Sequence, residues 1–218
     1  GKGTHKALNR FRELAYQASE NHTKTLWVLK CDIKKFFASI DQTILLRLFQ
    51  VNAIAGTWDN NLFNLIKEVV TSFYSTKPGV GLPLGNLTSQ LFANVYLNEL
   101  DQFIKHGLRQ KFYLRYADDF VIMHQDQGTL LEVLPKIGDF LDEKLKLTLH
   151  PDKIFLKTVA SGLDFLGWTH FPDHRVLRTS TKKRMFRNLH QGRTSLETQT
   201  SYLGLLGWGN GYKLARKL

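Results

Sequence analysis

Apolar positions in the first third of the chain alternate between helical and extended spacing. Residues 26–33 are a short, apolar, β-rich run, which indicates a buried strand. Asp41 is the predicted N-cap of a helix through Leu48, and residues 60–75 have the spacing of a further helix. Over residues 5–19, one helical face carries the apolar side chains Leu8, Phe11, Leu14, Tyr16 and Ala18.

The middle of the chain combines a turn-rich loop with a hairpin pattern. Gly79–Gly85 is a Gly/Pro loop, and the helix after it is expected to open at Thr88 or Ser89 and to end at Gly107. Two apolar runs, at 112–117 and 120–123, then flank a two-residue polar break, Asp118-Asp119. Apolar β-runs around such a break predict a β-hairpin.

The last part of the chain returns to alternating elements. Residues 129–146 predict an amphipathic helix, and strands are expected at 153–159 and 163–170 with a tight turn between them. The final forty residues are basic and in part helical. Strands and helices without regular βαβ alternation predict an α+β fold.

Composition narrows the class of protein. The chain has 218 residues, of which 43% are hydrophobic, so it is long and apolar enough for one sizeable domain and is not a disordered chain. The formal net charge of +11 favours a polyanionic partner, which is nucleic acid or an anionic membrane surface. Charge alone leaves both partners open.

The single cysteine, Cys31, excludes a disulfide framework and fits a reducing, cytoplasmic location. Its apolar neighbours favour a buried core thiol. The sequence has no apolar run of the length that a membrane span needs and no signal peptide, so no membrane partner is predicted. It opens with Gly1-Lys2-Gly3 and no initiator Met, from which we expect a fragment of a longer protein.

Three aspartates are candidates for catalysis. Asp32 ends an apolar strand, and Asp118 and Asp119 lie between two apolar runs, where a carboxylate is costly unless its charge is compensated. A pair of Mg²⁺ ions, about 3.5–4 Å apart, compensates such a cluster and supports in-line nucleotidyl transfer. The simpler interpretation of Asp118-Asp119 alone is a plain turn, because Asp favours turns.

Five segments together resemble the reverse transcriptase family, in the same order along the chain. Tyr116-Ala117-Asp118-Asp119 is similar to the catalytic hairpin of these enzymes. The other four are Asp32-Ile33-Lys34-Lys35-Phe36-Phe37, Gly81-Leu82-Pro83-Leu84-Gly85 with Ser89-Gln90, Leu147-Thr148-Leu149-His150-Pro151-Asp152-Lys153, and Phe165-Leu166-Gly167-Trp168. The resemblance spans residues 31–168, which is most of the chain.

The resemblance implies a right-hand polymerase palm, in which an antiparallel sheet packs on helices, with partial fingers and the start of a thumb. Residues 1–218 would form one reverse transcriptase domain. Within it, residues 1–24 would end the fingers and lead into the palm, residues 25–173 would form the palm, and residues 174–218 would hold a basic segment and the start of the thumb.

The resemblance also implies roles for individual residues. Asp32 and Asp118 would bind two Mg²⁺ ions, with Mn²⁺ as a substitute, while Asp119 supports the site and the carbonyl of Ile33 completes a metal shell. Lys153 would be a catalytic residue that protonates the departing pyrophosphate, although a solvated surface lysine is an equally good interpretation.

Further residues would contact the substrates, which are an RNA template, a DNA primer or cDNA, and a dNTP. Phe37 would exclude the ribose 2′-hydroxyl, unless its ring and that of Phe36 both belong to the core. Nucleotide binding would also involve Leu84, Gly85 and Gln90. The residues expected at the primer and template are Tyr116, Phe165, Leu166, Gly167, Trp168, Arg178, Lys182, Lys183 and Arg184.

Leu84 and Gln90 stand where most members of the family have other residues. The pattern that they form resembles that of the enzymes of diversity-generating retroelements, and the segment Gly1–Ala7 resembles their sequence as well. Such an enzyme would copy RNA with errors opposite adenine and work with a small basic accessory protein. Our hypothesis is that Leu84 relaxes base selection. The alternatives are a group II intron-like or defence-associated reverse transcriptase and a non-catalytic RNA-binding remnant. Phe37 and the lack of a GDD motif disfavour an RNA-dependent RNA polymerase.

The segment between His174 and Leu196 is basic and contains no acidic residue. We expect it to contact phosphates, although a solvated face is the simpler interpretation of a like-charge run. The nearby rings of Trp168, Phe171 and Phe186 would either stack on bases or pack in the core. The basic residues are Arg175, Arg178, Lys182, Lys183, Arg184, Arg187 and Arg193.

Overall fold

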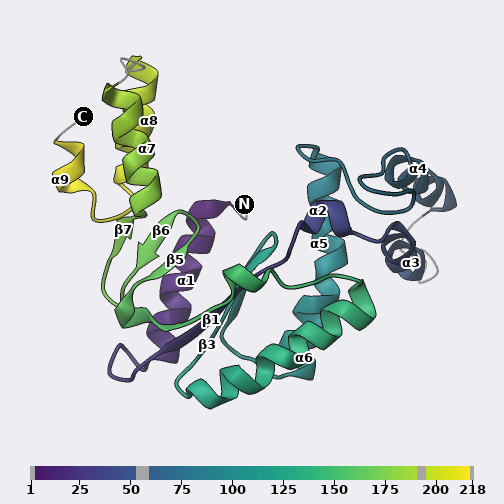
Figure 1. Ribbon diagram of the computed structural model, residues 1–218, viewed down its shortest axis with the longest axis horizontal. Helices are drawn as coiled ribbons and strands as arrows, with labels where there is room; N and C mark the ends of the chain where they lie inside the picture. Colours follow the sequence, from purple (N-terminus) through teal and green to yellow (C-terminus); the bar gives the residue numbers. More distant parts are fainter. Residues whose placement is uncertain (1–2, 53–58, 191–194, 217–218) are drawn as a thin grey trace. The chain divides into compact units, whose positions relative to one another are not determined.

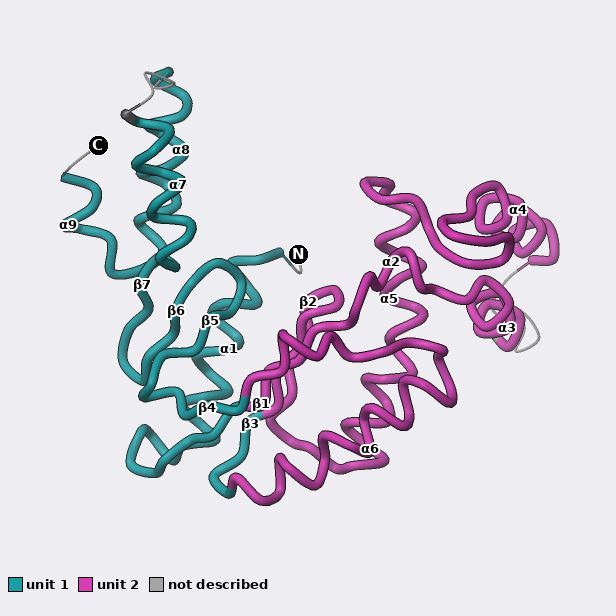
Figure 2. Tube along the Cα trace, viewed as in Figure 1, with its two compact units in different colours: residues 1–28, 123–126, 156–218 teal, residues 29–122, 127–155 magenta. Residues whose placement is uncertain are grey.

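The computed structural model describes residues 3–52, 59–190 and 195–216 of the chain. Arg193 and the first two residues of the segment Gly1–Ala7 lie outside these ranges. The chain folds into two compact units, which Figure 2 distinguishes by colour. Unit 1 comprises residues 1–28, 123–126 and 156–218, and unit 2 comprises residues 29–122 and 127–155.

Two sheets and several helices make up an α+β fold in the described part of the chain, which confirms the predicted class (Figure 1). One sheet has the strand order β2-β3-β1-β4 and the other has the order β5-β6-β7. The strands are β1 Trp27–Asp32, β2 Tyr113–Tyr116, β3 Asp119–His124, β4 Phe155–Thr158, β5 Leu163–Phe165, β6 Trp168–His170 and β7 Arg175–Leu177.

Helices connect and cover these strands. The α-helices are α1 Thr4–Ala18, α2 Phe36–Ser39, α3 Gln42–Asn52, α4 Asn60–Thr71, α5 Leu87–Gln102, α6 Gln127–Leu145, α7 Thr179–His190, α8 Leu196–Leu206 and α9 Tyr212–Ala215. A π-helical turn, η2 Phe103–Gly107, extends α5, and two 3₁₀ turns, η3 Pro151–Lys153 and η4 Val159–Ser161, flank β4. None of the described helices is long and apolar enough to cross a membrane.

In unit 1, α1 packs against the β5-β6-β7 sheet through its apolar face. Leu8, Phe11 and Leu14 are at most 4% exposed, and the Phe11 ring lies 4.4 Å from the His170 ring. The helices α7 and α8 run side by side (Figure 1) and pack on the same core. The buried cluster there consists of Leu8, Trp168, Leu177, Met185 and Leu206.

In unit 2, α5 is the central helix and packs against α3 and α6. The Phe49 and Phe92 rings make an edge contact at 5.2 Å, and the Tyr96 hydroxyl donates to the Leu145 carbonyl at 2.6 Å. Asp41 caps α3, since its Oδ1 accepts from the backbone of Thr43 and Ile44. This cap confirms the prediction made from the sequence.

Three element boundaries were predicted wrongly. The helix expected over 60–75 ends at Thr71, and the helix expected to open at Thr88 or Ser89 has Asn86 as its N-cap residue. The strand expected over 163–170 is a hairpin, because Leu166 and Gly167 both have positive φ and form a two-residue turn. Consequently β4 and β5 lie in different sheets, although the sequence suggested that they pair.

Candidate active site

Asp118 and Asp119 occupy the turn of the β2–β3 hairpin and the strand that follows it. Tyr116 pairs with Asp119 in the antiparallel register, so Ala117 and Asp118 form the two-residue turn. Ala117 has φ +53°, a left-handed conformation that is unfavourable for a residue with a side chain. The hairpin predicted from the two apolar runs is therefore confirmed, and Asp118 lies at its tip.

Asp32 ends β1, which lies next to β3 in the sheet, and its side chain is 17% exposed. The segment that follows α6 pairs with this strand end. His150 donates its backbone N–H to the Asp32 carbonyl at 2.8 Å, and Lys34 donates to Thr148 at 2.9 Å. Neither of these two bonds uses the Ile33 carbonyl.

Two lysines bind the carboxylates. Lys153 Nζ lies 3.0 Å from Asp32 Oδ1, and Lys30 Nζ lies 3.1 Å from Asp119 Oδ2. Lys30 was missed by the sequence analysis, although a lysine inside an apolar strand was a usable signal. Because β-strand side chains alternate, Lys30 and Asp32 project from the same face of β1. Asp32 and Asp119 are therefore each paired with a different lysine.

Burial and mutual repulsion raise the pKa values of the paired aspartates. Burial raises the pKa of Asp119 to about 6; Lys30 lowers it, and Asp32 and Asp118 raise it further. The pKa of Asp118 is also raised, first by burial and then by Asp32, while Lys153 opposes the shift. The three carboxylates are close enough to influence one another, as a common site requires.

Cys31 lies between Lys30 and Asp32 and is fully buried, which fits a core thiol. Burial, followed by the charge of Asp119, raises the pKa of its thiol to about 12. A thiol with so high a pKa is a poor nucleophile, because the thiolate is the reactive form.

The donor set fits Mg²⁺ as an open site. Asp119 Oδ1 is buried without a hydrogen-bond partner, and Asp32, Asp118 and the Ile33 carbonyl supply further oxygen atoms. Among the described residues, no three His, Cys, Asp or Glu side chains are arranged to hold a metal ion by themselves. Mg²⁺ usually binds only one or two carboxylates together with substrate phosphates and water, so a closed protein cage is not needed.

Phe37 and the Gly81–Gly85 loop are held together by backbone hydrogen bonds. Leu82 donates to the Phe37 carbonyl at 2.8 Å, and Gly81 donates to the Ile40 carbonyl at 2.8 Å. Phe36 is 2% exposed and belongs to the core, whereas Phe37 is half-buried and makes an edge contact with Phe36. The two rings therefore have different environments.

Gln42 anchors the start of the Gly81–Gly85 loop, a contact that the sequence did not reveal. Its buried amide donates to the Phe73 carbonyl at 2.6 Å and to the Gly81 carbonyl at 3.0 Å. Gly81 has φ +103°, and a Cβ there would lie 2.6 Å from Ser75 Oγ. Only glycine fits this position without rearrangement.

The remaining predicted nucleotide contacts are accessible. Leu84 is 79% exposed, Gln90 is also exposed, and Gly85 has φ +90° with open space where a Cβ would be. Tyr116 is half-buried and directly precedes the turn Ala117-Asp118. These side chains belong to the same compact unit as the three aspartates.

The predicted primer and template residues lie in unit 1, apart from Tyr116. Phe165 and Trp168 are 1% and 2% exposed, so their rings pack in the core and do not stack on bases. The turn of this hairpin, Leu166-Gly167, is half-buried, and Leu166 packs against the buried cluster of unit 1. Phe171 stacks on His174 at 4.8 Å, and Phe186 packs on the buried cluster of unit 1.

The basic residues on α7 and in the segment directly before it have different surroundings. Arg178 forms an ion pair with Asp164 at 3.1 Å, and Lys182 is half-buried. A hollow along α7 is lined by Ser180, Thr181, Lys183, Arg184 and Arg187, of which the three cations are exposed. An exposed group of cations on one helix suits contacts with phosphates.

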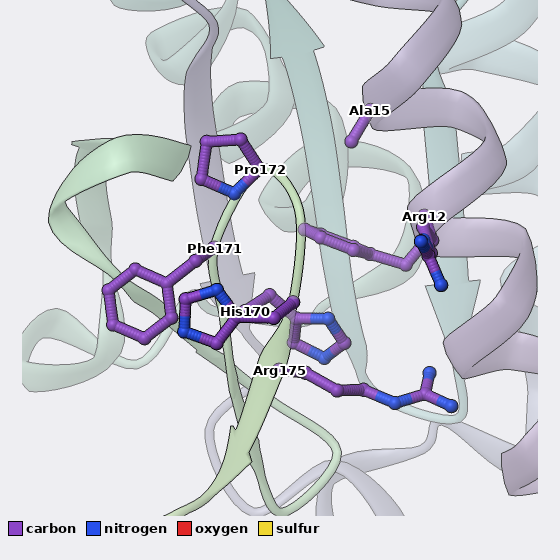
Figure 3. Close-up of a pocket in the computed structure, with 8 residues that line it drawn as sticks. Arg12, Ala15, His170, Phe171, Pro172 and Arg175 are labelled. Atoms are coloured by element: carbon purple, nitrogen blue, oxygen red, sulfur yellow. The ribbon is translucent and has the colours of Figure 1, made fainter. Parts of the chain in front are cut away.

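A small cavity of about 30 Å³ lies in unit 1, and none of the predicted catalytic residues lines it (Figure 3). Arg12 reaches it from α1 and Arg175 from β7, and Arg175 Nη1 is buried without a partner. One or two water molecules fit a cavity of this size and would satisfy that group. It is too small for a nucleotide.

Sequence comparisons identify similar proteins. A family model described as "Reverse transcriptase (RNA-dependent DNA polymerase)" matches residues 2–170. Protein YkfC of Escherichia coli K12 is 25% identical over 73% of the chain and 49% of its own length. The Retron Ec73 reverse transcriptase of E. coli is 27% identical over 72% of the chain and 53% of its own length.

The group II intron-encoded protein LtrA of Lactococcus lactis is 23% identical over 72% of the chain and 36% of its own length. The chain thus spans about half the length of these relatives, or less. Among solved structures, apo telomerase from Candida tropicalis has a TM-score of 0.63 at 14% identity, covering 81% of the chain and 40% of the telomerase. Telomerase from Candida albicans in complex with a telomeric RNA fragment has a TM-score of 0.62 at 12% identity, covering 81% of the chain and 34% of the telomerase. At such identity the likeness shows the fold alone, which is that of a polymerase palm.

Proposed function

The chain belongs to the reverse transcriptase family, and we propose that it carries out RNA-templated DNA synthesis by two-metal nucleotidyl transfer. The observation that carries this proposal is the meeting of Asp32 with the Asp118-Asp119 turn at neighbouring strands of one sheet. The mutual effects of these carboxylates on their pKa values support it. A plain surface turn would not bring a third acid, 86 residues away, to the same place.

Asp32 and Asp118 would hold two Mg²⁺ ions, with Mn²⁺ as an alternative, while Asp119 and the Ile33 carbonyl complete the site. Bound there, the ions would activate the primer 3′-hydroxyl and neutralise the triphosphate. Asp119 Oδ1, which is buried and unpartnered, supports this assignment. Lys30 keeps Asp119 in place from the neighbouring strand.

Lys153 is the proposed proton donor to the departing pyrophosphate. Its side chain is 51% exposed and its ammonium group is paired with Asp32, so the ammonium group would leave that carboxylate to reach a phosphate. Phe37 is the proposed barrier to the ribose 2′-hydroxyl, because its ring is half-buried and anchored beside the loop that carries Leu84 and Gly85. Leu84, Gly85 and Gln90 would contact the incoming dNTP.

An RNA template and a DNA primer would bind along unit 1 and at Tyr116. The turn Leu166-Gly167 would face the primer, with Phe165 and Trp168 as its buried supports. Phosphates would contact the basic helix α7 and its approach, through Arg178, Lys182, Lys183 and Arg184. The boundary between palm and thumb would lie near residue 173. A cytoplasmic location stays a prediction from the single cysteine.

Within the family, we propose that this chain is the error-prone enzyme of a diversity-generating retroelement and that a small basic accessory protein assists it. Leu84 and Gln90 support this type, and both side chains are exposed. A second candidate is a group II intron-like or retron-like enzyme, which the similarity to LtrA and to the Retron Ec73 enzyme favours.

Primer extension by the full-length protein on an RNA template tests these proposals, with products scored by sequencing. Asp118→Asn should abolish extension, whereas Asp139→Asn, an exposed carboxylate on α6, should leave it intact. Errors concentrated opposite adenine support the retroelement type, and faithful extension supports the second candidate. A lack of extension, even with an accessory protein supplied, would contradict polymerase function.

A further inference from the structure

The turn that carries Asp118 is held in a conformation that its sequence does not favour. Ala117 has φ +53°, where residues with a side chain are uncommon. Such a conformation persists only when the surroundings impose it. Contacts from outside the turn must therefore hold Ala117 in this conformation.

Arg115 supplies one such contact from within β2. Its Nη1 donates to the Ala117 carbonyl at 3.0 Å, so a side chain two residues before the turn binds the turn itself. The Arg115 side chain is only 9% exposed. A guanidinium group is planar and carries five N–H donors in a fixed fork, which lets one side chain join several acceptors rigidly.

The other end of this fork is fixed on α5. Arg115 Nε donates to Asp101 Oδ1 at 2.8 Å, and Nη2 donates to Asp101 Oδ2 at 2.7 Å, a bidentate pair. The Tyr113 hydroxyl also donates to Asp101 Oδ1, at 2.7 Å. Burial raises the pKa of the Tyr113 phenol above its usual range, so this hydroxyl remains a donor.

The same arginine connects the turn to the segment proposed to bind the nucleotide. Arg115 Nη1 also donates to Asn94 Oδ1 at 3.2 Å, and the Asn94 amide donates to the Gln90 carbonyl at 2.8 Å. A continuous set of hydrogen bonds thus runs from Gln90 through Asn94 and Arg115 to Ala117. All of these residues belong to unit 2.

We propose that Arg115 and Asp101 are positioning residues for the catalytic turn. Asp101 fixes the guanidinium on α5, and Arg115 holds the Ala117 carbonyl, which sets the place of the Asp118 carboxylate relative to the helix that carries Gln90. This inference deepens the proposed polymerase function and rests on it for its kinetic consequence. The structural part, restraint of the turn, does not depend on activity.

Two variants of the full-length protein test the pair. Arg115→Lys keeps the positive charge but loses the fork, and Asp101→Asn keeps the shape but loses the charge. Each should lower kcat for primer extension by about 10–100-fold, since a displacement of about 1 Å at a catalytic group has effects of this size. The KM for dNTP should stay within about threefold, because neither substitution removes the hydrogen bond between Asn94 and Gln90 or changes the loop before Gln90.

Tyr113→Phe is the matched control. It removes a hydrogen bond to the same oxygen of Asp101 but leaves the bond between Arg115 and Ala117 intact. Its kcat should stay within about threefold of that of the parent, even if its melting temperature falls as much as those of Arg115→Lys and Asp101→Asn. If Arg115→Lys proves unstable, Asp101→Asn decides the outcome.

Hydrogen–deuterium exchange separates this inference from the polymerase proposal. Peptides that cover residues 116–122 should exchange faster in Arg115→Lys and Asp101→Asn than in the parent and in Tyr113→Phe. If the parent shows no extension, the polymerase proposal fails and the exchange result alone decides the positioning role. Unchanged exchange in both variants, or an equal loss of kcat in Tyr113→Phe, would overturn the inference.

Discussion

The ammonium group of Lys153 lies 3.0 Å from Oδ1 of Asp32, although 121 residues separate them. The backbone creates this proximity: His150 donates to the Asp32 carbonyl, and Lys153 closes a 3₁₀ turn on His150. Lys153 therefore pairs with a carboxylate of the candidate site while its side chain stays 51% exposed, and its catalytic role stays a prediction.

Replacing Lys153 separates its two roles. Lys153→Ala should slow the chemical step by about 10²–10⁴-fold if the ammonium is the general acid. Affinity for Mn²⁺ should not fall, because removal of a competing cation frees Asp32. Rapid-quench single-turnover kinetics and Mn²⁺ titration by electron paramagnetic resonance measure the two effects. Lys136→Ala, an exposed lysine on α6, is the control; equal rates in the two variants would refute the assignment.

Lys30 should matter more for stability than an exposed ion pair does. Its partner Asp119 is 21% exposed and Lys30 itself 15% exposed, so Lys30→Met leaves a largely buried carboxylate without its cation. We expect unfolding by urea to show a loss of about 2–4 kcal/mol. The double variant Lys30→Met/Asp119→Asn should recover at least half of that loss, and failure to recover it would mean that Lys30 acts through other contacts.

Leu84 is a test of base selection that leaves the fold unchanged. Because Leu84 is 79% exposed, Leu84→Gln should alter the free energy of unfolding by less than about 0.5 kcal/mol. Misincorporation opposite template adenine should fall about 5- to 30-fold, equivalent to 1–2 kcal/mol of discrimination. Leu87→Gln, at 83% exposure three residues later, should change neither property. An unchanged error spectrum in Leu84→Gln would remove our account of low fidelity.

Truncation of Phe36 should lower the stability of the protein, whereas truncation of Phe37 should change its selectivity between ribonucleotides and deoxynucleotides. Phe36→Ala empties a core position that is 2% exposed and should cost about 3–5 kcal/mol of stability. Phe37→Ala should leave the protein folded and raise the use of ribonucleotides relative to deoxynucleotides by about 10–100-fold. Competition assays with matched nucleotide pairs measure this ratio. A ratio that stays constant would show that Phe37 is a packing residue.

Most elements of the fold could be predicted, because burial imposes a local period on the chain. The apolar face of α1, the buried strand β1 and the hairpin around Asp118 each follow from spacing over fewer than twenty residues. Errors fell where two short strands looked like one. The turn Leu166-Gly167 interrupts an apolar run, so the period of two continued across it; only the resemblance of Phe165–Trp168 to the family's primer-grip hairpin indicated the turn between β5 and β6.

Some features of the candidate site could likewise be predicted from the sequence, and others could not. The sequence by itself determined that Asp32, Asp118 and Asp119 are carboxylates at the ends of apolar runs, where desolvation makes them costly and therefore informative. It also determined the family, through five ordered segments. Only the tertiary structure decided which side chains meet: Lys153 with Asp32, Lys30 with Asp119, and Arg115 with Asp101. Periodicity reports which face of an element is buried, whereas an ion pair depends on the direction and distance of two side chains brought together by packing.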